Sequence, residues 1–420
     1  MYSLIDANNF YCSCERLFQP KLEGRPVVTL SNNDGCCIAR SEEAKALGID
    51  MGTPFFMLEK LIKKHNVVVF SSNYTLYGDI SDRVMKTLAG FVPNMEIYSI
   101  DEAFLDMHDL NHTDLLKLGM DIRRTIGKNL GIPVTVGIGP TKVLAKMANR
   151  YAKKKHRDTG VFYAANDDLV NEMLHFTEVS DIWGIGHQYA LLLRRNGFRT
   201  AYDVTKIPED WIRRNMSVVG QRLLNELKGT PCIQWEFEQK PKKNICTSRS
   251  FGKLLTDKNI IREALCNYAA TVARKLRDQK SCAGSLQVFI QTNPHKSEHK
   301  QYMHTITVKM QMPSNLSTEI IKSACKGLDI IFRHGYKYMK CGIIAMELVP
   351  ENQVQTSLFD QADKTRHKKL AQAMDSINKT MGRDVVRLAV QGFERSYRAK
   401  AEHLSQRYTT NMNQLLKVKI

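Results

Sequence analysis

The sequence lacks several features that would assign it to a membrane, to secretion or to a zinc-knuckle class. It has no run of 18 apolar residues, which a membrane-spanning helix requires. Residues 1–6 contain no basic side chain and place an acid at position 6, so they do not form a signal peptide. None of the 10 cysteines belongs to a Cys-x-x-Cys pair, which argues against a zinc knuckle. We therefore expect a cytoplasmic protein that does not enter a membrane and whose cysteines are mostly reduced and buried.

The charge of the chain is strongly positive and unevenly distributed. A net charge of +18 points to a polyanionic partner, either nucleic acid or an acidic membrane surface. Residues 1–110 hold 10 Lys and Arg against 15 Asp and Glu, a balance of −5, whereas the remainder holds 51 against 28, a balance of +23. An acidic catalytic portion followed by a body that holds a polyanion would show this division. A basic protein with uneven charge is the plainer alternative.

The first 165 residues predict a sheet in which acids stand at strand ends. Residues 2–6 form a short buried strand that ends on Asp6, and β-like residues 96–100 and 102–105 flank the pair Asp101–Glu102. Further strands are predicted at 26–30, 67–71, 134–138 and 160–163, and helices at 12–18, 41–47, 76–91, 115–129 and 141–154. This alternation predicts an α+β fold with helices on one face of the sheet. If the two acid-bearing strands are neighbours, the three carboxylates meet.

The rest of the 420 residues divides into further regions, as a chain too long for one core should. Residues 166–235 predict short helices around Trp183-Gly184-Ile185-Gly186, and a polar linker follows. Residues 244–348 predict the order β-α-β-β-α-β, which is typical of a small ferredoxin-like domain. Residues 349–360 are polar and linker-like, and residues 361–420 form a basic tail with 13 Lys and Arg against 5 Asp and Glu.

Three carboxylates close together suit phosphoryl transfer. Mg²⁺ prefers oxygen ligands, and two such ions about 4 Å apart stabilise the attacking and leaving oxygens of a displacement. Asp6, Asp101 and Glu102 have the right chemistry, and their apolar neighbours make it costly to leave them without a partner or a metal. A solvated turn is the alternative for an Asp-Glu pair, because acids are mostly exposed.

Several motifs, in order along the chain, resemble those of Y-family DNA polymerases. The segments Asp6-Ala7-Asn8-Asn9-Phe10-Tyr11 and Tyr98-Ser99-Ile100-Asp101-Glu102-Ala103-Phe104 are similar to the two catalytic motifs of that family, and residues 135–148 to a third. Three further segments narrow the resemblance to the UmuC branch, the catalytic subunits of bacterial polymerase V and its plasmid-borne relatives. They are residues 31–36, 71–74 and 183–186. The resemblance spans the chain from residue 1 to residue 410.

The resemblance implies a right-hand polymerase and assigns roles to individual residues. It implies a ferredoxin-like palm with small fingers in residues 1–165, a helix-hairpin-helix thumb in 166–235 and a ferredoxin-like little finger in 244–348. Asp6, Asp101 and Glu102 would hold two Mg²⁺ ions. Tyr11 would be the steric gate against a 2′-hydroxyl, with an ordinary core tyrosine as the alternative. The other residues implied to meet the nucleotide are Phe10, Arg40, Lys45 and Lys153, with main-chain amides of residues 8–11 cradling its phosphates.

The resemblance also implies how DNA and protein partners are held. The amides around Gly184 and Gly186 would bond a phosphate without reading sequence. On the little finger, phosphate contacts are expected from Lys253, Arg274 and Lys309, which would make binding dependent on salt. Gln355, Leu358 and Phe359 lie in a short peptide similar to those that grip the sliding clamp. A processed UmuD-like dimer and a RecA-type filament are further implied partners, beside primer-template DNA and deoxynucleoside triphosphates.

The implied function is error-prone translesion DNA synthesis in the SOS response to DNA damage. One alternative is a catalytically silent DNA-binding or recruitment factor with a polymerase fold, against which the three intact acids argue. Another is a different metal-dependent nucleotidyl enzyme, such as a cyclase, which would not need the helix-hairpin-helix motif or the basic second half of the chain.

Overall fold

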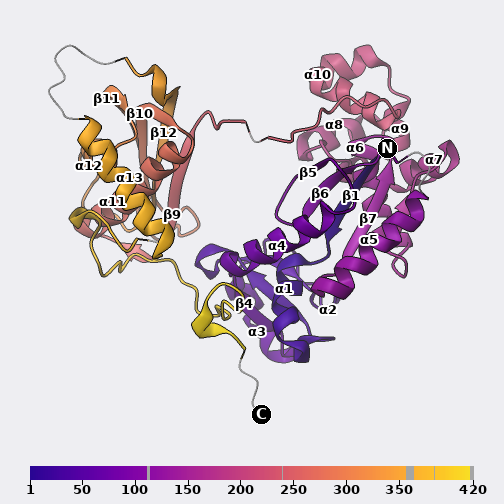
Figure 1. Ribbon diagram of the computed structural model, residues 1–420, viewed down its shortest axis with the longest axis horizontal. Helices are drawn as coiled ribbons and strands as arrows, with labels where there is room; N and C mark the ends of the chain where they lie inside the picture. The colour runs from indigo at the N-terminus through magenta and orange to yellow at the C-terminus, as the bar shows by residue number, and fades with distance from the viewer. Residues whose placement is uncertain (111–113, 239, 356–363, 383, 417–420) are drawn as a thin grey trace. The chain divides into compact units, whose positions relative to one another are not determined.

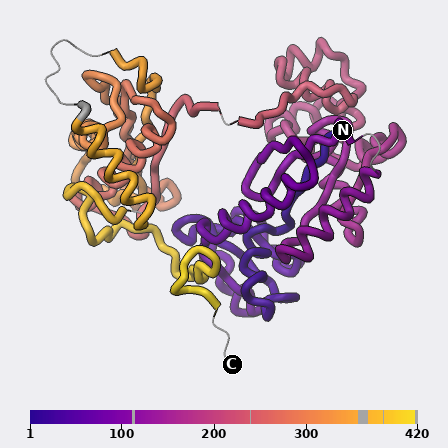
Figure 2. Tube along the Cα trace, in the orientation of Figure 1, coloured from indigo at the N-terminus to yellow at the C-terminus, as the bar shows by residue number. Residues whose placement is uncertain are grey.

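The structure is a computed structural model that describes residues 1–110, 114–238, 240–355, 364–382 and 384–416. The chain divides into two compact units: Met1–Gln239 together with Glu402–Ile420, and Lys240–Ala401. The chain therefore leaves the first unit once and returns to it near its C-terminus (Figure 2). No helix of the described residues is long and apolar enough to cross a membrane.

A five-stranded sheet with the order β5-β6-β1-β7-β8 forms the centre of the first unit (Figure 1). Its strands are β1 (Tyr2–Ala7), β5 (Met95–Ile97), β6 (Glu102–Asp106), β7 (Val134–Gly139) and β8 (Val161–Tyr163). The sheet places β1 between β6 and β7 and pairs it antiparallel with both. The two acid-bearing strands are therefore neighbours.

Helices cover both faces of this sheet, so the prediction of helices on one face alone is wrong. They are α1 (Phe10–Phe18), α4 (Tyr74–Leu88), α5 (Leu115–Leu130) and α6 (Lys142–Lys155). Ile5 faces the core shared with α4 and α5, whereas its neighbour Leu4 packs with Ala145 of α6. Successive strand residues point to opposite faces, so Asp6 shares a face with Leu4 and lies on the α6 side. At Gly137 of β7 a Cβ atom would lie 2.0 Å from an α6 amide nitrogen, so glycine is required for the close approach of α6.

The first unit also contains a smaller sheet of order β3-β2-β4. It contains β2 (Val27–Leu30), β3 (Cys37–Arg40) and β4 (Val68–Ser71), with α2 (Glu42–Ala46), α3 (Phe55–His65) and the short turns η1 (Pro20–Leu22) and η2 (Asn32–Asp34). The sequence did not predict α3 or β3. In α3 the apolar side chains of Phe56 and Met57 are 72% and 64% exposed, which blurs the helical periodicity on which such a prediction rests.

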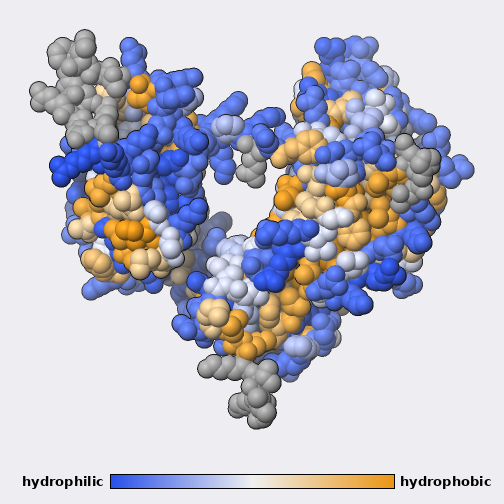
Figure 3. Space-filling model, viewed as in Figure 1, coloured by the Kyte–Doolittle hydropathy of each residue, from blue (hydrophilic) through white to orange (hydrophobic). Residues whose placement is uncertain are grey.

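Short helices follow the central sheet and pack around their own apolar core. They are α7 (Asp167–Phe176), η3 (Val179–Asp181), α8 (His187–Arg195), α9 (Ala201–Thr205) and α10 (Glu209–Leu227). Asn166 caps α7, and Thr200 with Asp203 forms a capping box on α9. The face of this region seen in Figure 3 is mostly hydrophilic.

The second unit has the predicted order β-α-β-β-α-β. Its elements are β9 (Ile245–Leu255), α11 (Lys258–Asp278), β10 (Ser281–Thr292), β11 (Met303–Ser314), α12 (Ser317–Ile331) and β12 (Tyr338–Pro350). The four strands form an antiparallel sheet of order β11-β10-β12-β9. Both helices pack on one face of it, leaving the other face open.

The residues expected to form one basic tail belong to both units. Within this tail, α13 (Lys364–Thr380) and η5 (Ala389–Gln391) lie in the second unit, and η6 (Met412–Gln414) lies in the first. The short turn η4 (Glu351–Gln353), which precedes the tail, also lies in the second unit. The α13 helix is tied to α11 by Arg277, whose guanidinium contacts the Asp375 carboxylate at 2.6 and 2.8 Å. The sequence could not predict this division because it depends on packing between residues more than 300 positions apart.

Candidate active site

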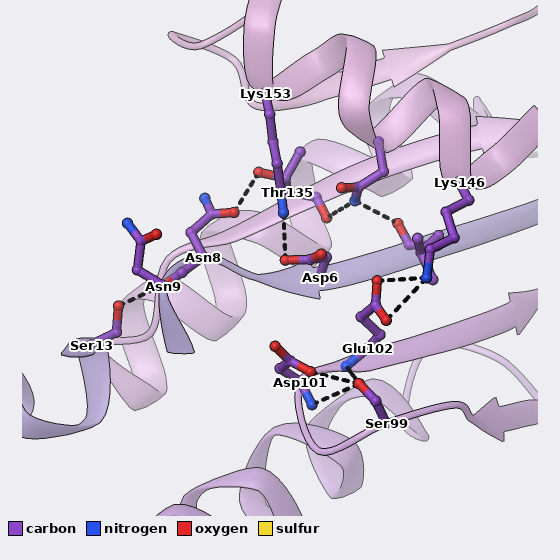
Figure 4. A network of polar contacts seen from close by, with 12 residues as sticks. Asp6, Asn8, Asn9, Ser13, Ser99, Asp101, Glu102, Thr135, Lys146 and Lys153 are labelled. Atoms are coloured by element: carbon purple, nitrogen blue, oxygen red, sulfur yellow. Dashed lines mark hydrogen bonds and ion pairs between the residues drawn. The ribbon is translucent and has the colours of Figure 1, made fainter. Parts of the chain in front are cut away.

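Asp6 and Glu102 are direct partners across β1 and β6, and Asp101 precedes Glu102 at the start of β6 (Figure 4). The carbonyl oxygen of Asp101 accepts a hydrogen bond of 2.9 Å from the amide of Ala7. The structure therefore brings together the three acids that the sequence singled out. Paired strand residues point to the same face, so Asp6 and Glu102 both lie on the α6 side.

Each of the three carboxylates has its own partner in this structure (Figure 4). Nζ of Lys153 lies 2.6 Å from Oδ1 of Asp6, and Nζ of Lys146 lies 2.9 and 3.1 Å from the two carboxylate oxygens of Glu102. The hydroxyl of Ser99 donates to Oδ1 of Asp101 at 2.6 Å. Within the described ranges, no three Asp, Glu, His or Cys side chains are already arranged around one point as metal ligands.

The sequence predicted a role for Lys153 but none for Lys146 or Ser99. Lys146 and Lys153 are seven positions apart on α6, which is two helical turns, so they project from one face of the helix. That spacing was the available signal, but only the pairing of β1 with β6 shows that this face looks at two acids. Ser99 accepts hydrogen bonds from the amides of Asp101 and Glu102 at 3.2 and 3.0 Å, and so shapes the turn that presents them.

The Asp6 carboxyl group is hard to ionise where it lies. Burial is the largest influence and raises its pKa from 3.8 to about 6, while Lys153 lowers the pKa through charge and a hydrogen bond. The neighbouring Glu102 and Asp101 raise it further. A site that gathers negative charge in this way favours a cation, and carboxylate oxygens suit a hard divalent ion.

The predicted steric-gate residue Tyr11 lies in the first turn of α1, directly beyond the acids. Its ring stacks on that of Tyr77 at a centroid distance of 4.5 Å and an interplanar angle of 15°. The side chain of Phe10 is buried in the core, so only its main chain is available to a nucleotide. Of the amides expected to cradle phosphates, that of Asn8 is already bonded to the carbonyl oxygen of Pro133 at 2.8 Å.

Arg40 ends β3 and Lys45 lies in α2, and both make local contacts. Nη1 of Arg40 donates to the carbonyl oxygen of Ile49 at 2.8 Å. Nζ of Lys45 pairs with Glu42 at 2.6 Å, and the same carboxylate accepts a hydrogen bond from the Asn9 side chain at 3.1 Å. Glu42 thereby links α2 to the turn that leads into α1.

The loop of Gly184 and Gly186 joins η3 to α8, as expected for a hairpin between helices. Gly184 has a φ of +97°, a conformation that favours glycine, and Gly186 is the N-cap of α8. Trp183 turns inward: its indole donates to the Tyr98 hydroxyl at 3.2 Å, and Lys146 lies 5.3 Å from its ring. The loop is thus joined to the residues around Glu102.

The candidate DNA contacts of the second unit come from different places. Lys309 lies on β11 opposite Ser285 and points to the open face of the sheet, and Lys253 is exposed near the end of β9. Arg274 lies on the helix α11, where it pairs with Asp278 at 2.8 Å. Lys340 of β12, which the sequence did not single out, lies over the Phe289 ring on the open face. Of the residues predicted to bind the clamp, Gln355 is exposed, and Leu358 and Phe359 lie outside the described residues.

Three family models match the chain. Residues 5–150 match the impB/mucB/samB family, residues 242–358 match the C-terminal domain of that family, and residues 368–418 match a domain of unknown function. The chain is 42% identical to Protein UmuC of Salmonella typhimurium over 100% of both chains. It is 38% identical to Protein ImpB of Salmonella typhimurium, over 98% of this chain and 97% of that one. DNA polymerase IV 1 of Bacillus subtilis is 26% identical over 91% of each chain.

The fold is that of solved Y-family polymerases. A Y-family chimera of the Dbh and Dpo4 polymerases matches 83% of this chain and 99% of its own with a TM-score of 0.65 and 19% identity. An insertion ternary complex of Dbh DNA polymerase matches the same shares with a TM-score of 0.52. These likenesses confirm the predicted polymerase fold. The alternative of a catalytically silent factor is not favoured.

The family resemblance predicted from the motifs is therefore confirmed. DNA and nucleotides are the substrates, and the enzyme depends on divalent metal. The chain belongs to the impB/mucB/samB family and is a UmuC-like, Y-family DNA-directed DNA polymerase that carries out error-prone translesion synthesis in the SOS response.

Proposed function

We propose that this polymerase adds deoxynucleotides by a two-metal mechanism in which Asp6, Asp101 and Glu102 hold two Mg²⁺ ions. The observation that carries the proposal is the pairing of Asp6 with Glu102 on the α6 side of the sheet, next to Asp101. Three carboxylates supply hard oxygen ligands, as Mg²⁺ requires. When bound, such ions stabilise the attacking and leaving oxygens of the transfer.

Lys146 and Lys153 are proposed to balance the charge of the acids and to guide the triphosphate. Each contributes a positive charge within 3 Å of a carboxylate, and both extend from the same face of α6. Lys153, whose side chain is partly exposed, is proposed to contact the triphosphate as well as Asp6. Arg40 and Lys45 are proposed to meet the same phosphates from the fingers, together with the amides of Phe10 and Tyr11.

Tyr11 is proposed to exclude ribonucleotides. A ring that stacks on Tyr77 cannot yield to a 2′-hydroxyl without breaking that stack, so the deoxyribose is preferred. Replacing Tyr11 with alanine removes the ring and should admit ribonucleotides, whereas phenylalanine at this position keeps the ring and should preserve the preference.

DNA is proposed to be held through its phosphates by the thumb loop and the little finger. Amides around Gly184 and Gly186 supply contacts without sequence preference. On the open sheet face, Lys309 and Lys340 supply positive charge, and Lys253 lies near the end of the edge strand. Arg274 is the least suited of the predicted contacts because it lies on a helix and is already paired.

We assign residues 1–165 to the palm and fingers, 166–235 to the thumb, 244–348 to the little finger, 349–360 to a clamp-binding linker and 361–420 to the basic C-terminal region. The proposed partners are the sliding clamp through Gln355, Leu358 and Phe359, a processed UmuD-like dimer and a RecA-type filament, in the cytoplasm. The deciding experiment is primer extension on damaged and undamaged templates with Mg²⁺, with and without these partners. Extension past the lesion is expected, and no nucleotide addition under any of these conditions would refute the proposal.

A further inference from the structure

The C-terminal residues 402–410, here called the return segment, lie in the first unit beside the smaller sheet (Figure 1). Leu404 forms a parallel bridge with Ser71 at the end of β4. The amide of Ser71 donates to the carbonyl oxygen of His403 at 3.0 Å, and the amide of His403 donates to the Ser71 hydroxyl at 3.0 Å. The return segment thus continues the hydrogen bonding of the sheet.

Two side chains anchor the return segment more firmly than a chance surface contact would. Asn73 is 2% exposed, and its Nδ2 contacts the carbonyl oxygen of Ser405, the hydroxyl of Ser405 and the carbonyl oxygen of Gln406 at 3.2, 3.0 and 3.2 Å. The ring of Tyr408 stacks on Phe18 of α1 at 4.6 Å and 12°, and is 8% exposed. These contacts bury polar and apolar groups of the return segment against the start of α4 and the end of α1.

The return segment also supplies a hydrogen bond to a buried carboxylate below the proposed steric gate. Glu15 of α1 is 0% exposed, and its Oε1 accepts from the Tyr77 hydroxyl at 2.6 Å and from the Ser405 hydroxyl at 2.9 Å. Its Oε2 has no hydrogen-bond partner. Burial raises the pKa of Glu15 to about 7. Because Tyr77 carries the stacked ring of Tyr11, a continuous chain of contacts runs from Ser405 through Glu15 and Tyr77 to Tyr11.

We propose that the return segment is part of the nucleotide-binding site, in which Ser405 and Tyr408 act as positioning residues for the Tyr11 ring. This inference rests on the proposed role of Tyr11. The return segment lies within residues 368–418, the portion that matches a domain of unknown function, so the inference assigns a role to part of that domain.

The physical reason is the cost of a buried carboxylate that loses donors. With Ser405 in place, Glu15 has two hydroxyl donors and is sealed from water. Without the Ser405 hydroxyl, the Glu15 carboxylate keeps only one hydrogen-bond donor, so it must either bind a water molecule or move. Tyr77 is the remaining donor, and its position should change with that of Glu15. The plane on which Tyr11 stacks is then no longer held in one position. Loss of the Tyr408 ring should have a related effect, because α1 carries Phe18, Glu15 and Tyr11 on one helix.

The test compares deoxy- and ribonucleotide insertion by the full-length protein in primer extension. The ratio of the two kcat/KM values is measured on one preparation, so the fraction of folded enzyme cancels. We expect Ser405→Ala to lower the preference for deoxynucleotides by about tenfold, the effect of losing one hydrogen bond to a charged group. Tyr408→Ala should lower the preference in the same direction, through loss of the ring that stacks on Phe18. Ser405→Thr restores a hydroxyl and should restore the preference. Gln406→Ala is the matched control, because only the carbonyl oxygen of Gln406 has a recorded contact with Asn73 and its side chain is exposed.

The outcomes separate this inference from the proposed gate. If Tyr11→Ala admits ribonucleotides but Ser405→Ala and Tyr408→Ala keep the wild-type ratio, the gate stands and the inference is wrong. The inference is also wrong if both variants lose insertion of the two sugars equally as they lose thermal stability, since that pattern marks a purely structural role. If Tyr11→Ala itself leaves the ratio unchanged, the gate fails and the inference with it.

Discussion

Nζ of Lys153 lies 2.6 Å from the carboxylate of Asp6, so this largely buried acid is paired with a lysine two turns beyond the lysine that pairs with Glu102. Asp6 and Glu102 in turn are opposite one another in the sheet. One face of α6 therefore balances the negative charge of acids on the neighbouring strands β1 and β6. Replacing one of these acids should disturb the charge of the site and its metal binding more than the folding of the protein.

Asp101→Ala should abolish nucleotide addition and leave DNA binding largely intact. The change removes a proposed metal ligand but no core packing, and the loss of transition-state stabilisation should lower kcat by at least about a hundredfold. Primer extension measures the first effect and a DNA-binding titration the second. Asp109→Ala, at an exposed turn of the same region, is the control. Near-normal extension by Asp101→Ala would mean that the site lies elsewhere.

The stability of the first unit should depend on the protonation of Glu15. Its folded-state pKa is about 7 against an ordinary 4.5, so between these values the folded form binds a proton that the unfolded form releases. The stabilisation of the folded form by this bound proton is fully present below about pH 4.5 and is lost as the pH rises to about 7. Glu15→Gln keeps an acceptor for Tyr77 and Ser405 but cannot ionise.

Denaturation of wild type and Glu15→Gln between pH 5 and 8 measures this effect as the difference between the two free energies of unfolding. Towards the upper end of the range, the free energy of unfolding of the variant should rise by ~3 kcal/mol relative to that of the wild type, since each pKa unit corresponds to about 1.4 kcal/mol. A constant difference across the range would show that the carboxyl group does not titrate as its burial requires.

Lys309→Ala should weaken DNA binding similarly for all sequences and reduce its salt dependence. Loss of one phosphate contact lowers the slope of log affinity against log salt by about 1. The measurement is a binding isotherm at several salt concentrations. Lys322→Ala, an exposed lysine on α12 of the same unit, is the control and should leave the slope unchanged. Equal changes in both variants would indicate a general charge effect instead of a contact on the open sheet face.

Deletion of residues 355–359 should lower DNA synthesis only when the sliding clamp is loaded. The Leu-Phe pair of this peptide is proposed to fill an apolar pocket of the clamp, so its loss should shorten products in the presence of clamp. Product length with and without clamp is the measurement, and Leu358→Ala with Phe359→Ala provides a version without a change in chain length. Equal loss without clamp would point to a folding defect.

Much of the fold follows from local patterns. The short apolar strand at residues 2–6 and the helices at 41–47 and 115–129 were predicted from local patterns, and the structure has β1, α2 and α5 at these places. The β-α-β-β-α-β order of the second unit also follows from periodicity. The α3 helix was missed because exposed Phe56 and Met57 interrupt the pattern.

The sequence by itself determined the acids, their apolar surroundings and the family, because these depend on residue type and short spacing. Only the tertiary structure decided which face of α6 meets the acids, that Trp183 turns toward Tyr98, and that residues 402–410 return to lie beside Glu15. Those relationships join positions up to 390 residues apart. They arise from burial and hydrogen bonding between distant segments, which no local pattern along the chain encodes.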